Sequence, residues 1–149
     1  METDAKKWLE SLSRMKPNFD RFSSVSLSGI NVLSADHGRV VCSFCIPSYL
    51  TDAEGYWQPG AIVTLMDVVG VVAIMSIEDT MKVTVDLAIS FFSQAKLHEE
   101  VEIEAHTVEQ KGKLTMVVVH IRKKASQQLV AVGRQWMIFS STRPFESKL

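Results

Sequence analysis

The feature that most constrains this chain is a long apolar stretch, Ala61–Ile77, that carries a single carboxylate. The stretch is apolar on nearly every face of a helix, which is typical of a helix buried in a core. Pro59 stands at a favourable helix start, so we expect a helix from Gly60 to about Asp79. A charge buried without a purpose is expensive. Asp67 is therefore either held by a structural bond, for instance to Thr64, or used in chemistry.

The rest of the chain indicates what covers this helix. We expect a short amphipathic helix at about residues 3–15, then two strands within residues 26–36 and 38–50 that meet at a turn, His37-Gly38. Four segments rich in β-branched and aromatic residues follow the long helix, at 82–95, 99–110, 113–124 and 128–139. This order predicts an α+β fold in which an antiparallel sheet, ending in a four-strand meander, wraps around one long central helix.

The chain has 149 residues, enough for one domain with a sizeable core, and no linker or repeat divides it. We therefore expect a single domain over residues 1–149 with a polar tail at about 140–149. A membrane span is not expected, because the apolar stretch is marginal in length and an Asp at its centre costs ~2.5–3.5 kcal/mol.

The composition excludes several classes of protein. Hydrophobic residues make up 46%, charged residues 22%, and the net charge is −1, so there is no basis for a nucleic-acid partner.

Cys42 and Cys45 are spaced C-x-x-C, but they lie in a predicted strand, where residues three apart face opposite sides. No second ligand pair accompanies them, and the four histidines lack a metal-binding spacing. We expect two plain cysteines and no metal site.

The chain ends in Ser147-Lys148-Leu149. A terminal S-K-L is the address read by the peroxisomal import receptor, and the polar residues before it favour exposure. We therefore predict import from the cytosol into the peroxisome. The alternative is coincidence, on the order of one chain in a few thousand from average residue usage.

Three short motifs have an informative order and spacing. They are Asp52, Gly55, Gln58-Pro59-Gly60 and Asp67; then Thr84-Val85-Asp86 with Ser93-Gln94-Ala95-Lys96; and last Gly133-Arg134. From about Val25 to Phe139 the chain resembles the small acyl-CoA thioesterases of the hotdog fold, of the thioesterase superfamily member 2 and phenylacetate-pathway type. The resemblance implies hydrolysis of acyl-CoA in lipid metabolism, with coenzyme A as part of the substrate and no cofactor. It also implies a homodimer or a homotetramer built as a dimer of dimers, with active sites between subunits.

The resemblance assigns a role to each motif residue. It makes Asp67 the general base or nucleophile, Thr84 the residue that holds the water, and Asp52 the residue that orients the attack. A backbone N–H at the helix start polarises the thioester carbonyl, for which Gly60 is preferred over the side chain of Gln58. Elementary chemistry agrees, because a carboxylate on an apolar helix is poorly solvated and a helix start favours a developing oxyanion.

Coenzyme A is expected at two segments. The first is Phe92, Ser93, Gln94, Ala95 and Lys96, and the second is the turn from Gln110 through Lys111, Gly112 and Lys113. Three lysines, Lys96, Lys111 and Lys113, are candidates to meet its phosphates. For any one of them a solvated turn is the alternative.

The chain departs from the family pattern at three motif positions. Asp52 replaces Asn, Gln58 replaces His, and Pro59 replaces the first Gly. Proline has no N–H, so a candidate oxyanion donor is missing. We therefore expect a slow thioesterase, and the alternative is an acyl-CoA-binding protein with little or no activity. A third possibility, a hydratase or dehydratase, lacks the expected Asp and His loop motif. Acyl chain length and the choice between dimer and tetramer remain open.

Overall fold

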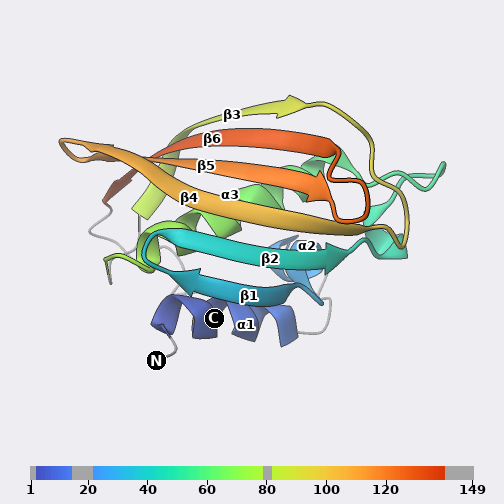
Figure 1. Ribbon diagram of the computed structural model, residues 1–149, viewed down its shortest axis with the longest axis horizontal. Helices are drawn as coiled ribbons and strands as arrows, with labels where there is room; N and C mark the ends of the chain where they lie inside the picture. Colours follow the sequence, from blue (N-terminus) through green and yellow to red (C-terminus); the bar gives the residue numbers. More distant parts are fainter. Residues whose placement is uncertain (1–2, 15–21, 79–81, 140–149) are drawn as a thin grey trace.

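The computed structural model describes residues 3–14, 22–78 and 82–139. Six antiparallel strands form one curved sheet, and a long helix lies behind it (Figure 1). The strands are β1 (Asn31–Asp36), β2 (Arg39–Cys45), β3 (Lys82–Phe91), β4 (Glu100–Lys111), β5 (Leu114–Lys123) and β6 (Leu129–Phe139). The helices are α1 (Asp4–Arg14), α2 (Phe22–Leu27) and α3 (Pro59–Met75), with a 3-10 turn at Ser48–Leu50. The predicted α+β fold, a sheet around one long helix, is confirmed.

The order of the strands differs from the predicted four-strand meander. Strands β4, β5 and β6 do form a meander, but the order across the sheet is β1-β2-β4-β5-β6-β3. Strand β3 lies beside β6 because β2 pairs with the other side of β4, from Cys45 opposite Glu100 to Arg39 opposite His106. This places β3 at an edge of the sheet.

Helix α3 is apolar all round because it is covered on two sides. The sheet contacts one side, and α1 and α2 contact another. The helix ends at Met75, earlier than expected, because Ser76 stops it. The Ser76 hydroxyl donates to the Ala73 carbonyl (2.7 Å) and accepts from the Gly38 N–H (2.8 Å), which ties the helix end to the β1–β2 turn. The expected end, Asp79, lies outside the described residues. None of the described helices is long and apolar enough to cross a membrane.

The first helix forms as predicted, and its apolar side is buried against β1 and α3. Helix α2 was not predicted. Its Val25 and Leu27 are buried against the core, and the residues preceding Asn31 are therefore not part of the first strand. The predicted turn at His37-Gly38 is confirmed, with both residues at positive φ.

The two cysteines lie on opposite faces of β2, as predicted. Cys42 is buried, Cys45 is exposed, and both are free thiols. Burial raises the pKa of Cys42 to about 12, so it remains protonated and unreactive. Within residues 3–14, 22–78 and 82–139, no group of three or more His, Cys, Asp or Glu side chains is arranged to hold a metal ion. The predicted targeting residues, Ser147, Lys148 and Leu149, lie outside the described residues.

Candidate active site

The carboxylate of Asp67 reaches from the middle of α3 to the β3–β6 edge of the sheet. Its Oδ1 accepts a hydrogen bond from the Thr84 hydroxyl (2.7 Å) and another from Nε2 of Gln135 (2.8 Å). Its Oδ2 accepts no hydrogen bond from any described residue. One oxygen is thus fixed by two donors, while the other is available to take a proton from water.

A β-bulge in β3 explains how the Thr84 side chain reaches Asp67. Thr84 lies opposite Met137 and Asp86 lies opposite Trp136, so Val85 is an extra residue that forms a bulge. Such bulges redirect side chains and often lie beside active sites. The structure brings these two predicted site residues, Thr84 and Asp67, into a direct hydrogen bond. The Thr64 hydroxyl donates to the Gly60 carbonyl (2.9 Å), so the particular bond suggested between Thr64 and Asp67 is not formed.

Sequence reasoning missed Gln135. Its side chain is fully buried (0% exposed), and besides Asp67 its Nε2 lies 3.2 Å from Thr84 Oγ1. A signal was present, because Gln135 shares the inward side of β6 with Gly133 and Met137. An uncharged polar residue at such a core position needs a polar partner.

The start of α3 offers one free donor. Gln58 caps the helix, and its carbonyl accepts from the N–H groups of Ala61 (3.1 Å) and Ile62 (3.2 Å). Pro59 has no N–H, and the N–H of Gly60 makes no hydrogen bond with any described residue. The Gln58 side chain donates to the Thr51 carbonyl (3.0 Å) rather than capping the helix. Gly60 is thus the available donor at this helix start.

Asp52 lies in an exposed loop and closes it. Its Oδ1 accepts from the N–H groups of Glu54 (2.9 Å) and Tyr56 (3.0 Å), around a turn with Gly55 at φ 84°. No hydrogen bond joins Asp52 to Asp67. Within one chain Asp52 therefore shapes the loop before α3.

One chain does not bring the predicted donor and the predicted base together. Gly60 and Asp67 are seven residues apart on the same helix, which corresponds to about 10.5 Å along its axis. A catalytic base and an oxyanion donor must each lie about 3 Å from reacting atoms of the same substrate. Seven residues along one helix is therefore a long separation for two groups that serve one thioester.

The first predicted coenzyme A segment lies beside the start of α3. The Ala95 carbonyl accepts from the Trp57 N–H (2.8 Å), and Lys96 Nζ lies 5.9 Å from the centre of the Tyr56 ring. The Ser93 hydroxyl donates to the Leu129 carbonyl (2.7 Å). Phe92 and Gln94 are exposed, so the segment offers both an aromatic and a polar side chain to solvent.

The second predicted segment, the β4–β5 turn, lies at the opposite end of the sheet (Figure 1). Its Gln110 and Lys113 line a cavity of about 400 Å³ together with Glu78, Lys82, Ile138 and Phe139. Lys82 is buried, donates to Thr115 Oγ1 (2.6 Å) and pairs with Glu78 (3.4 Å). Lys111 and Gly112 are exposed and do not line this cavity. The two segments are thus not brought together in one chain.

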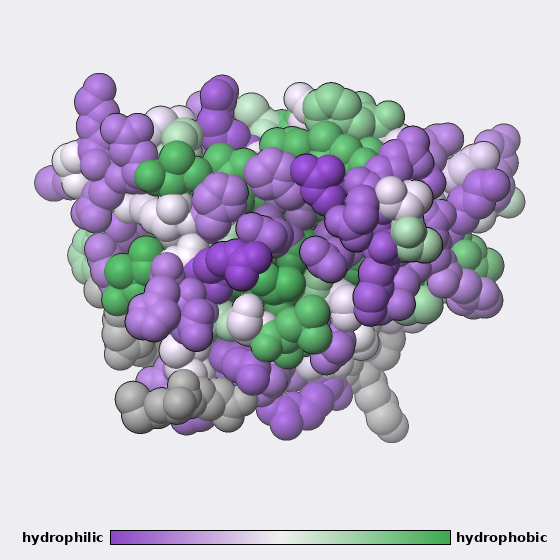
Figure 2. All heavy atoms as spheres, in the orientation of Figure 1, coloured by the Kyte–Doolittle hydropathy of each residue, from purple (hydrophilic) through white to green (hydrophobic). Residues whose placement is uncertain are grey.

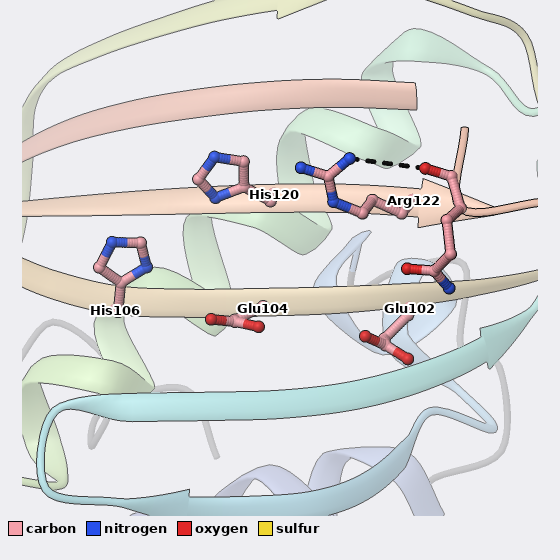
Figure 3. Close-up of a pocket in the computed structure, with 6 residues that line it drawn as sticks. Glu102, Glu104, His106, His120 and Arg122 are labelled. Atoms are coloured by element: carbon pink, nitrogen blue, oxygen red, sulfur yellow. Dashed lines mark hydrogen bonds between the residues drawn. The ribbon is translucent and has the colours of Figure 1, made fainter. Parts of the chain in front are cut away.

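A second cavity, of about 280 Å³, lies on the outer face of the sheet (Figure 3). It is lined by Glu102, Glu104, His106, His120, Arg122 and Gln127. All but Gln127 lie on β4 and β5, where they alternate with the fully buried Val101, Ile103 and Ile121, so they face away from α3 and Asp67. Gln127 lies in the loop before β6. Hydrophilic and hydrophobic side chains are mixed over this face (Figure 2).

Comparison with known proteins decides the family. The model of the thioesterase superfamily matches residues 54–130. The human protein acyl-coenzyme A thioesterase 13 is 34% identical over 118 residues, which cover 78% of this chain and 81% of that protein. The chain belongs to the thioesterase superfamily. The predicted family and the predicted enzyme class, a thioester hydrolase, are confirmed.

Solved structures of this superfamily have the same fold. Zebrafish thioesterase superfamily member 2 superposes with a TM-score of 0.81 at 30% identity, over 94% of this chain and 100% of that one. The mouse protein of that name gives 0.77 at 28% identity, over 93% and 98%. A hypothetical thioesterase protein from Streptococcus pneumoniae, solved with coenzyme A, gives a TM-score of 0.71 at 19% identity, over 74% of this chain and 85% of that one. The predicted hotdog fold is thus confirmed for this chain.

Proposed function

We propose that this thioesterase hydrolyses acyl-CoA to a free acid and coenzyme A, with Asp67 as general base or nucleophile. The observation that carries the proposal is the carboxylate of Asp67, in which Oδ1 is fixed by Thr84 and Gln135 while Oδ2 is free. The relatives named acyl-coenzyme A thioesterase support the substrate class.

The geometry suits an attack by water. Oδ2 of Asp67 takes a proton as the water oxygen bonds to the thioester carbon, or Oδ2 attacks that carbon itself. Because the Thr84 hydroxyl gives its only hydrogen to Asp67, its oxygen can accept from the water and hold it. The carbonyl oxygen gains negative charge, which a free N–H at a helix start stabilises. Collapse of the adduct expels the coenzyme A thiolate. After attack by water this leaves the free acid; after attack by Oδ2 it leaves a mixed anhydride on Asp67, which a water then hydrolyses to the free acid and the Asp67 carboxylate.

We propose that the site lies between two copies of the chain, with the Gly60 N–H of one facing Asp67 of the other. The separation of these residues along α3 supports a second chain. The edge strand β3 also supports it, because no described strand pairs with its outer side and its Val85 and Phe91 are exposed. Such an edge favours pairing with another strand. In a dimer the Phe92–Lys96 segment and the Lys82–Lys113 cavity, from different chains, meet one coenzyme A.

A thiol-release assay separates this enzyme from an acyl-CoA carrier. Purified protein is incubated with aliphatic and aromatic acyl-CoAs and a thiol-trapping dye, and binding is measured in parallel by calorimetry. We expect thiol release with at least one acyl-CoA, at a slow rate because Pro59 removes one donor. Saturable binding of every acyl-CoA without thiol release would show that the protein is an acyl-CoA carrier and not an enzyme.

We further propose that the enzyme works in the peroxisome, in lipid metabolism, after recognition of Ser147-Lys148-Leu149 by the import receptor. The test is a fluorescent reporter fused to the N-terminus of the full chain, with the last three residues present or deleted. We expect punctate peroxisomal signal only when the three residues are present. The same diffuse signal from both fusions would make the tripeptide coincidental.

A further inference from the structure

The buried amide of Gln135 occupies space that a missing side chain leaves on α3. A Cβ added to Gly70 would lie 1.8 Å from Oε1 of Gln135 and 2.9 Å from its Cδ. Gly70 is three residues after Asp67, so both are on the same side of the helix. Glycine is unfavourable inside a helix. Here its absence of a side chain is what allows the amide to lie against Asp67.

The surroundings of this amide fix its orientation. Its Nε2 lies near three acceptors: Asp67 Oδ1 (2.8 Å), Thr84 Oγ1 (3.2 Å) and the Asp67 carbonyl oxygen (3.4 Å). Its Oε1 is buried and has no hydrogen-bond partner among the described residues. The reverse orientation would place Oε1 against a carboxylate oxygen. The amide thus leaves its acceptor atom, Oε1, unpaired and donates from Nε2 to Asp67.

We propose that Gln135 is a positioning residue that holds Asp67 by Oδ1 and so makes Oδ2 the oxygen that reacts. The proposal rests on the proposed function, in which Asp67 is the base or nucleophile. Thr84 alone leaves the carboxylate free to rotate about a single hydrogen bond. A second donor on the same oxygen, from a different strand, fixes the plane of the carboxylate and stabilises its charge.

The test variant is Gln135→Met, which keeps the length and the unbranched shape of the side chain but removes the donor. It also removes the unpaired Oε1, so we expect an unchanged or higher melting temperature. We expect kcat to fall about 10- to 100-fold, with KM for acyl-CoA within about twofold, because a displaced catalytic group mainly affects the chemical step. Gln135→His, which restores a donor, should recover part of kcat.

A second readout requires no turnover. The ¹³C chemical shift of the Asp67 carboxyl carbon is measured at neutral pH in the wild type and in Gln135→Met. We expect a different shift in the variant, because the carboxylate has lost one of its two donors. Equal chemical shifts in the two proteins, or an unchanged kcat in the variant, would overturn the positioning role. Failure of the proposed function is seen separately, as full activity of Asp67→Asn or no activity in the wild type.

Discussion

The two faces of the sheet carry two polar clusters of opposite character. On the inner face, one carboxylate, one hydroxyl and one amide meet between α3 and the β3–β6 edge. On the outer face, five charged or titratable side chains line an open cavity: Glu102, Glu104, His106, His120 and Arg122 (Figure 3). By count of ionisable groups, the outer cluster is the richer one.

Two observations favour the inner cluster as the catalytic one. The outer charges compensate one another, as in the two hydrogen bonds from Arg39 to Glu104 (3.1 and 3.2 Å), which lower the pKa of Glu104. The inner carboxylate has no positive partner among the described residues and is held by neutral donors, with one oxygen free. The comparison teaches that orientation and incomplete compensation identify a reactive group better than cavity size or number of charges.

The largest expected effect separates the two clusters directly. Asp67→Asn should lower kcat by about 10²–10⁴-fold, because an amide cannot take the proton. The fold should be retained, since the Asn Oδ1 can accept the same bonds from Thr84 and Gln135. Thiol release and the thermal unfolding midpoint are measured together.

The matched control is Glu104→Gln on the outer face, which also replaces a carboxylate by an amide. We expect its kcat to remain within about twofold of the wild type. If Glu104→Gln lost as much activity as Asp67→Asn, the outer cluster would belong to the catalytic site.

The next effect concerns the start of α3. Pro59→Gly restores an N–H beside that of Gly60, so we expect kcat to rise at least about tenfold without tighter substrate binding. The measurement is steady-state kinetics on a variant shown to be folded. An equal or lower kcat would mean that the site does not use an amide at residue 59.

A smaller effect tests the fit between Gly70 and Gln135. Gly70→Ala should lower the free energy of unfolding by about 1–3 kcal/mol, because its Cβ overlaps Oε1 of Gln135. In a Gln135→Ala background the same change should be tolerated, since the overlapping atom is gone. Urea unfolding of the four proteins measures this, and equal costs in both backgrounds would contradict the contact.

The smallest effect belongs to the outer face. Burial, with the nearby His106 and Arg122, lowers the pKa of His120 from 6.5. The folded state therefore binds a proton less readily than the unfolded state, so this contribution to stability is present above about pH 6.5 and is lost as the pH falls through the lowered pKa. We expect the drop in melting temperature between pH 7.5 and 5.5 to be smaller in His120→Gln. A drop equal to that of the wild type would exclude His120 as its source.

Much of the fold followed from local patterns. The apolar run around Asp67 predicted the central helix, and the segments rich in β-branched and aromatic residues predicted the strands after it. The placement of β3 beside β6 could not be predicted, because strand pairing depends on contacts far apart in the sequence. Thr84 was predicted as a site residue from a motif, whereas the only sequence signal for Gln135 was its inward position in β6. Motifs also could not show that the two predicted coenzyme A segments lie at opposite ends of the sheet within one chain.

The central claim is that Asp67 of one chain works with the helix start of another, and subunit mixing tests it most directly. Asp67→Asn removes the base, and Gly60→Phe blocks the helix start with a side chain whose Cβ meets no atom within 4 Å. Each variant alone should be inactive. After exchange of equal amounts, about half of the dimers are mixed and each has one intact site of two, so about a quarter of wild-type activity should return. No recovery, in a mixture shown by native mass spectrometry to contain mixed dimers, would contradict the account.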